Sequence, residues 1–121
     1  MIHLTLPLPP NRANARWHWR TEKQKKDDYY SLCECGTMLR DRPAVPLKRA
    51  RIAVTLYTWS AMDLDNLMAR LKWPVDWLVR RGYIADDSPD VLEWTLPRQE
   101  IDRRRPRIEI ELEAITEDEA A

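Results

Sequence analysis

The segment from Arg49 to Trp59 alternates regularly between two sets of side chains. Its even-numbered positions from 52 to 58 carry Ile, Val, Leu and Thr, and the odd-numbered positions carry Ala, Thr, Tyr and Trp. Successive side chains of a β-strand point to opposite faces, so residues two apart share a face. The segment is therefore the clearest predicted strand, and it requires a sheet to pair with.

Periodicity and breakers predict five further elements around this strand. Three more strands are expected at 2–6, 91–96 and 107–114, and two helices at 19–39 and 65–81. Gly82 is a typical helix end, and Pro74 predicts a kink or break within the second helix. The predicted order is β-α-β-α-β-β, an α+β fold with a mixed sheet and helices packed on one face.

With 121 residues the chain has room for a single domain with a modest core. Dimerisation would hide additional apolar surface. The acidic end, about 116–121, is predicted to be disordered. No apolar run approaches the roughly 20 residues that cross a bilayer, and the first residues do not resemble a signal peptide. We therefore expect a cytoplasmic protein without a membrane partner.

Cys33 and Cys35 are the two cysteines of the chain. Their spacing is poor for a structural disulfide, and no second Cys pair completes a zinc site. We expect both to be thiols within a partly buried helix.

The net charge is zero, but the charges are unevenly distributed. Residues 1–58 contain 11 Lys and Arg against 5 Asp and Glu, whereas residues 59–121 contain 9 against 15. Two groups of basic residues stand out: Arg12, Arg16, Arg20, Lys23, Lys25 and Lys26, and then Arg98, Arg103, Arg104, Arg105 and Arg107. Such groups can bind phosphate even in a neutral chain, although a solvated charged face is an equal alternative.

Two short acidic motifs flank the predicted second helix. Asp63 and Asp65 fall where a strand ends and a helix begins, and on an extended segment both carboxylates would point to one side. Asp86 and Asp87 follow the helix. The simpler interpretations are a helix cap for the first motif and a turn for the second.

On a helical wheel, Asp65, Lys72 and Asp76 form one polar stripe beside the apolar face. A lysine in this place could hold a phosphate or stabilise charge that develops during its cleavage. The plain alternative is an ion pair between Lys72 and Asp76.

Carboxylates without a catalytic His or Cys favour hard, oxygen-preferring cations such as Mg²⁺ or Mn²⁺. In phosphodiester hydrolysis these ions activate the attacking water and neutralise the leaving oxygen. His3 and His18 are poorly suited to histidine-based nuclease chemistry. Gly36 and Gly82 cannot form a glycine-rich phosphate loop, so no nucleotide cofactor is expected.

Taken together, the motifs resemble the RusA family of Holliday junction resolvases, which are common in phages and prophages. The resemblance is dense over residues 63–89. It is carried by Asp63-Leu64-Asp65-Asn66-Leu67, Ala69-Arg70-Leu71-Lys72, Asp76, Leu78, Gly82-Tyr83-Ile84 and Asp86-Asp87-Ser88-Pro89. Near the N-terminus, Pro9-Pro10-Asn11 and Asn14 also resemble the opening of the family's sequences.

The resemblance implies a homodimer that cuts four-way DNA junctions symmetrically, in the cytoplasm of a bacterial host. Asp63, Asp65 and Asp87 match the metal-binding aspartates, and Lys72 matches the essential lysine; counting forward from the first motif would place Ala69 there instead. Possible auxiliary residues are Asn66, Asp76 and Asp86. The arginines that some members carry before the first aspartate are replaced here by Trp59-Ser60-Ala61-Met62.

Residues of both basic segments are candidate DNA contacts: Asn11, Arg12, Asn14, Arg16, Arg20, Lys23, Arg103, Arg104 and Arg105. Three alternatives remain open: a less selective nuclease for flaps and branched DNA, a non-catalytic DNA-binding or packaging protein, and an interaction module that exposes tryptophans. Trp17 and Trp19 could stack on exposed bases, whereas Trp73, Trp77 and Trp94 are expected in core or dimer packing.

Overall fold

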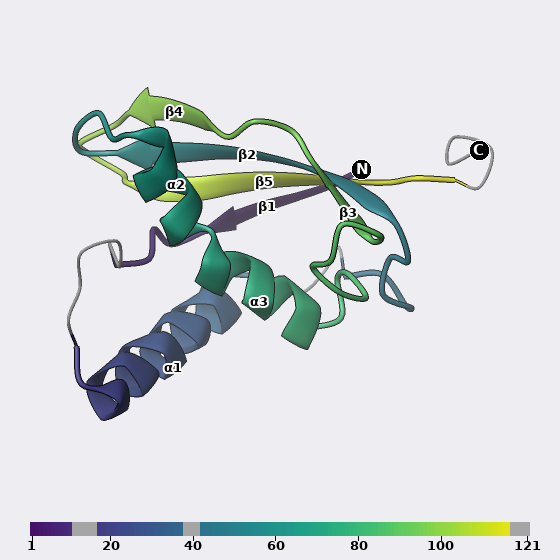
Figure 1. Cartoon of the computed structure of the whole chain (residues 1–121), viewed down its shortest axis with the longest axis horizontal. Coiled ribbons are helices and arrows are strands. Elements are labelled where there is room, and N and C mark those ends of the chain that lie inside the picture. The colour runs from purple at the N-terminus through teal and green to yellow at the C-terminus, as the bar shows by residue number, and fades with distance from the viewer. Residues whose placement is uncertain (11–16, 38–41, 117–121) are drawn as a thin grey trace.

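The computed structural model describes residues 1–10, 17–37 and 42–116, and it has an α+β fold with one mixed sheet (Figure 1). The acidic end beyond Thr116 and the segment 38–41 lie outside the described residues. In chain order, the elements are β1 (Ile2–Leu6), α1 (Trp19–Gly36), β2 (Ala50–Thr58), α2 (Leu64–Arg70), α3 (Lys72–Arg80), β3 (Leu92–Trp94), β4 (Arg98–Ile101) and β5 (Arg107–Ala114).

Strand β2 is the centre of the sheet. It pairs antiparallel with β5, in a register that runs from Ala50 opposite Ala114 to Tyr57 opposite Arg107. On its other side it pairs in parallel with β3 near its start and with β4 near its end. The short strand β1 adds to the far side of β5. The predicted alternation in β2 is confirmed, because every second residue from Ala50 to Thr58 is buried.

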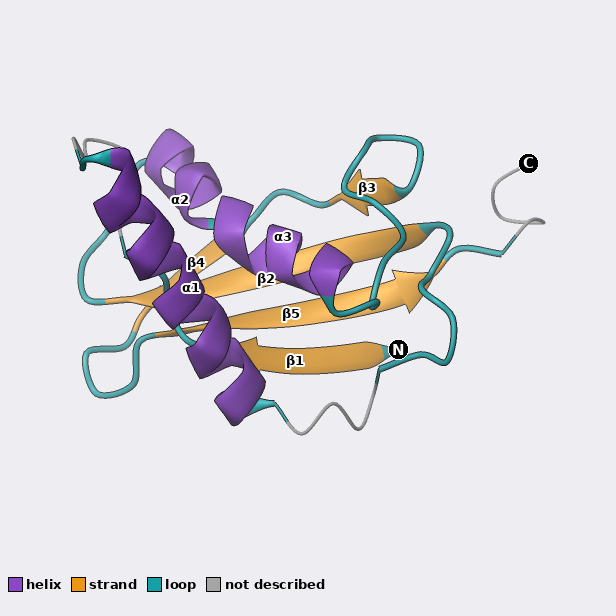
Figure 2. Cartoon of the chain, turned by 90° about the horizontal axis from the view of Figure 1, so that it is seen from below, coloured by secondary structure: helices purple, strands orange, loops and turns teal. Residues whose placement is uncertain are grey.

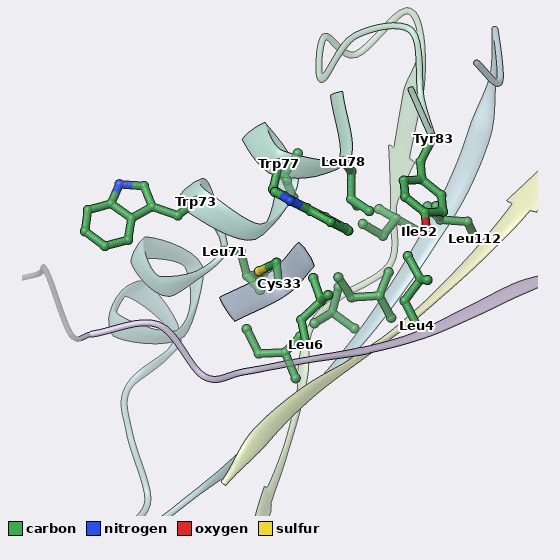
Figure 3. Close-up of a cluster of buried hydrophobic side chains, with 14 of the residues drawn as sticks. Leu4, Leu6, Cys33, Ile52, Leu71, Trp73, Trp77, Leu78, Tyr83 and Leu112 are labelled. Carbon is green, nitrogen blue, oxygen red and sulfur yellow. The ribbon is translucent and has the colours of Figure 1, made fainter. Parts of the chain in front are cut away.

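The three helices lie together against one face of the sheet (Figure 2). Figure 3 shows the core between the two layers, where Leu4, Ile52 and Leu112 of the strands face Trp77 and Leu78 of α3. Trp73 and Trp77 are almost completely buried and Trp94 packs against the core, so their predicted packing role is confirmed for this chain.

The second predicted helix is divided, but not at the expected residue. Helix α2 ends at Arg70 and α3 begins at Lys72, with Leu71 between them. Pro74 lies in the first turn of α3, where a missing N–H is tolerated. In one continuous helix, Pro74 would have to donate to the carbonyl of Arg70, which a proline cannot do. The break therefore precedes the proline by a turn.

A strand was missed in the segment 98–107, which was expected only to join two strands. Residues Arg98–Ile101 form β4 and pair in parallel with Thr55–Thr58 of β2. The expected strand 91–96 is reduced to Leu92–Trp94. The predicted order is therefore wrong in two places, because the structure has two helices where one was expected and an additional strand.

Cys33 and Cys35 are both free thiols, as expected, and of the two only Cys33 is buried. Burial raises the pKa of Cys33 to about 12. The thiol is therefore protonated at neutral pH and is part of the packing between α1 and the sheet.

No helix among the described residues is long and apolar enough to cross a membrane.

Replacing each of the two glycines of the chain with alanine tests whether the backbone conformation at that position requires glycine. Gly82 ends the second helical region with a φ of 80°, and a Cβ there would meet only Pro46 Cγ at 3.8 Å. We expect Gly82→Ala to lower the free energy of unfolding by about 1–2 kcal/mol, the cost of a left-handed conformation in an L-residue. Urea unfolding measures the change.

Gly36→Ala is the control, because Gly36 is the last residue of α1 and nothing lies within 4 Å of the added Cβ. It should leave the free energy of unfolding unchanged or raise it by up to about 1 kcal/mol. Equal losses in the two variants would contradict this account of Gly82.

Candidate metal and phosphate site

Asp63 directly precedes α2, at the N-cap position. Its backbone is extended (φ −69°, ψ 156°), and its carbonyl accepts the N–H of Leu67 at 3.0 Å. Its carboxylate makes no capping hydrogen bond. The simpler interpretation of Asp63 as a side-chain cap therefore does not hold, and the exposed carboxylate is left for another role.

Asp65 lies in the first turn of α2. The expectation that Asp63 and Asp65 share a face of an extended segment is wrong, because the helix begins at Leu64, between them. Both residues are exposed, and neither carboxylate has a partner among the described residues. Asn66 follows on the same helix and is half-buried.

The loop after α3 presents Asp87. The carboxylate of Asp86 accepts the backbone N–H of Asp87 at 2.8 Å, and the carbonyl of Ser88 accepts the N–H groups of Val91 and Leu92. Asp86 therefore holds the turn together, as its composition predicted. The Asp87 carboxylate is exposed and has no partner within the part of the chain that the structure describes.

A hollow beside the α2–α3 break brings Asp87 next to Lys72. We call it the α2–α3 hollow; it has a volume of about 210 Å³. Its lining consists of Met68, Leu71, Lys72, Val75, Asp87 and Trp94. Asp65 does not line the hollow; it lies on α2 one helical turn before Met68, which does.

The structure does not gather the three aspartates into a finished site. Among residues 1–10, 17–37 and 42–116, no group of three or more His, Cys, Asp or Glu side chains is close enough to hold a metal ion. Carboxylates repel one another when no cation lies between them. All three carboxylates here are exposed side chains that can change rotamer.

Lys72 and Asp76 form the expected ion pair, with Nζ 3.8 Å from Oδ2. The lysine side chain is 62% exposed, so the pair contributes only a few tenths of a kcal/mol and is easily exchanged for a phosphate. Asp65 lies on α2, whereas Lys72 and Asp76 lie on α3. The three residues therefore do not form the single polar stripe that the helical wheel predicts.

The candidate DNA contacts are only partly described. Asn11, Arg12, Asn14 and Arg16 lie outside the described residues. On α1, Lys23 pairs with Asp27 at 3.0 Å, and the Arg20 guanidinium lies 5.1 Å from the Trp19 ring centroid.

The other basic segment forms the turn between β4 and β5. The carboxylate of Asp102 accepts the N–H groups of Arg104 and Arg105 and pairs with Arg107 at 2.9 Å. Arg103 donates through Nε to the carbonyl of Trp59 at 3.2 Å. This turn therefore lies beside the loop that leads from β2 to Asp63.

Gln99 has a structural role that the sequence does not predict. Its side-chain amide donates to Thr58 Oγ1 at 2.8 Å and to the carbonyl of Ser60 at 3.1 Å. Its Oε1 accepts the N–H of Met62 at 3.2 Å. Gln99 thus ties β4 to the loop that carries Asp63, and a glutamine in an expected loop gives no sequence signal for this role.

Comparison with known proteins adds no assignment, because no protein-family model and no curated protein matches the chain.

Removing the Gln99 side chain tests its hold on the loop. We expect Gln99→Ala to speed amide hydrogen exchange at Met62 by roughly fivefold or more, the factor that about 1 kcal/mol represents. NMR-detected exchange measures it. Gln24→Ala, which removes a surface contact with Asp28 on α1, is the matched control and should leave Met62 unchanged.

Asp102 makes the free energy of unfolding depend on pH. Its hydrogen bond with Arg107, helped by the backbone N–H groups of the turn, lowers the pKa of Asp102 below its ordinary value of 3.8. A carboxyl whose pKa is depressed in the folded state stabilises it above the ordinary pKa, and this contribution is lost as the pH falls through the depressed value. Asp102→Asn should therefore show a shallower loss of stability below about pH 4, measured by urea unfolding across the acid range. An identical slope in both proteins would contradict the assignment.

Proposed function

We propose that this protein is a metal-dependent endodeoxyribonuclease that cleaves branched DNA, with the four-way junction as its principal substrate. One observation carries the proposal. Asp87 and Lys72 line a common hollow beside α2, which Asp63 precedes and whose first turn contains Asp65, and none of the three carboxylates has a partner among the described residues.

The chemistry of these donors fits Mg²⁺ or Mn²⁺. Carboxylate oxygens are the ligands that these ions prefer, and the exposed side chains at the start of α2 and in the loop after α3 can change rotamer to approach a shared cation. When bound, such an ion supplies a water activated for attack on phosphorus. Asp63, Asp65 and Asp87 would hold it.

Lys72 has a separate task in this proposal. Its ammonium group is exposed, is held only by a weak pair with Asp76, and borders the same hollow as Asp87. From there it can bind the phosphate that is to be cleaved and stabilise the negative charge that builds up on its oxygens. Asp76 keeps the lysine oriented until the phosphate arrives.

The four-way junction and the homodimer rest on the resemblance to RusA resolvases. Two copies of the site would cut opposing strands of one junction, which a single copy cannot do symmetrically. We accordingly propose a homodimer acting on DNA in the cytoplasm of a bacterial host, encoded by a phage or prophage.

A second candidate, a less selective nuclease for flaps and other branched DNA, uses the same residues. Cleavage rates on matched junction, flap and duplex substrates separate the two. A non-catalytic DNA-binding protein would instead show no Mg²⁺ or Mn²⁺ uptake in isothermal titration.

Replacing Asp65 with Asn tests the metal site. We expect the wild type to cleave a synthetic four-way junction with Mg²⁺ or Mn²⁺. Asp65→Asn should bind the junction but cleave it more than roughly 100-fold more slowly, because loss of even an outer partner of a metal ligand costs 10- to 100-fold. A gel assay of labelled junction measures both binding and cleavage.

Asp90→Asn is the matched control, because Asp90 is an exposed carboxylate in the same turn as Asp87 but is not one of the three proposed metal ligands. It should cleave at the wild-type rate. Undiminished cleavage by Asp65→Asn, or an equal loss in Asp90→Asn, would rule out the assigned site.

A further inference from the structure

A groove runs between the first half of α1 and the start of α3. We call it the α1–α3 groove. Trp19, Lys23 and Lys26 line it from α1, and Lys72, Trp73 and Asp76 line it from α3, around a volume of about 200 Å³. The buried ring of Trp73 lies 6.2 Å from that of Tyr29 and 6.5 Å from that of Trp17, so aromatic packing fixes the separation of the two helices.

The groove is suited to an anion. Its three lysines outnumber its two acids, Glu22 and Asp76. Lys26 has no partner among the described residues, and the pairs of Lys23 with Asp27 and Lys72 with Asp76 are exposed and weak. A row of phosphates could replace both pairs at little cost, and it would release counterions.

Trp19 adds an aromatic surface to this basic groove. It is 63% exposed, and the Arg20 guanidinium lies 5.1 Å from its ring centroid. An exposed tryptophan among cations is the combination that binds unpaired nucleotides, through base stacking and phosphate contacts. In a duplex the faces of the bases are covered by their neighbours, so a paired strand offers Trp19 no face on which to stack.

Lys72 connects the groove to the candidate site. It lines the α1–α3 groove on one side and the α2–α3 hollow, with Asp87, on the other. A strand that lies along Lys26 and Lys23 would therefore reach Lys72 and, on its other side, Asp87.

We propose that the α1–α3 groove binds an unpaired DNA strand at a branch point, with its phosphates on Lys23 and Lys26 and a base stacked on Trp19. This inference rests on the proposed function and narrows it. The strand bound in the groove is one whose bases are unstacked at the branch point of the junction, next to the cleaved phosphate.

The test measures binding without cleavage. A fluorescently labelled single strand of about 12 thymidines and a duplex of equal length are titrated by anisotropy in the presence of EDTA, at several salt concentrations. We expect wild type to bind the single strand more tightly than the duplex. Trp19→Leu should weaken single-strand binding by roughly 5- to 150-fold, which corresponds to the loss of about 1–3 kcal/mol of stacking per base.

The double variant Lys23→Ala/Lys26→Ala should weaken single-strand binding and reduce its salt slope by about 0.7 for each lost phosphate contact. Lys48→Ala, an exposed lysine outside the groove, is the control for charge, and Trp19→Tyr, which retains an aromatic face, should restore most of the affinity lost in Trp19→Leu. All four positions are half-buried or exposed, and thermal melts followed by circular dichroism verify folding.

Unchanged single-strand binding in the groove variants would overturn the inference, as would equal losses for single strand and duplex or an equal loss in Lys48→Ala. These readouts do not require catalysis. A wild-type protein that binds the single strand through the groove but fails to cut branched DNA with metal would contradict the proposed function and leave the groove assignment standing.

Discussion

The pairing of β2 with its neighbours is the interaction on which the rest of the structure depends. Its buried residues contribute to the core on the face that the helices cover. Its backbone is hydrogen-bonded to β5 on one side and to β3 and β4 on the other. Because the strand ends at Thr58, the chain leaves the sheet beside β4, where Gln99 holds the loop that leads to Asp63. The position of the first aspartate is therefore set by the sheet, although the residue itself lies outside it.

The candidate site also depends on a backbone hydrogen bond that Pro74 cannot make. Because Pro74 cannot donate to the carbonyl of Arg70, the helical segment divides at Leu71. Asp65 and Lys72 then lie on separate helices that run in different directions (Figure 1), and the hollow shared by Lys72 and Asp87 lies beside the break. A continuous helix would instead have set the aspartate and the lysine on one straight face, as the helical wheel assumed. Lys72 also lines the α1–α3 groove together with Lys23 and Lys26.

Much of the fold could be predicted from local patterns, and what could not depends on distant partners. The alternation in β2 and β5 and the glycine at position 82 are strong signals, and the elements they predict are present. Strand β4 has no apolar alternation, and it is a strand because the β2 backbone pairs with it. Gln99 contacts residues 37 to 41 positions away, so no local pattern identifies it. The aspartates and Lys72 were identified as candidates by residue type and order, but the extended geometry assumed for Asp63 and Asp65 was wrong.

We propose that Asp63, Asp65 and Asp87 together bind one divalent metal ion beside Lys72. The most direct measurement is a crystal structure of the protein grown with Mn²⁺, with anomalous diffraction used to locate the ion. We expect an anomalous peak at the edge of the α2–α3 hollow, with an oxygen atom of each of the three carboxylates within about 2.0–2.4 Å of it. No peak there, or a peak held by other side chains while these three carboxylates point into solvent, would contradict it.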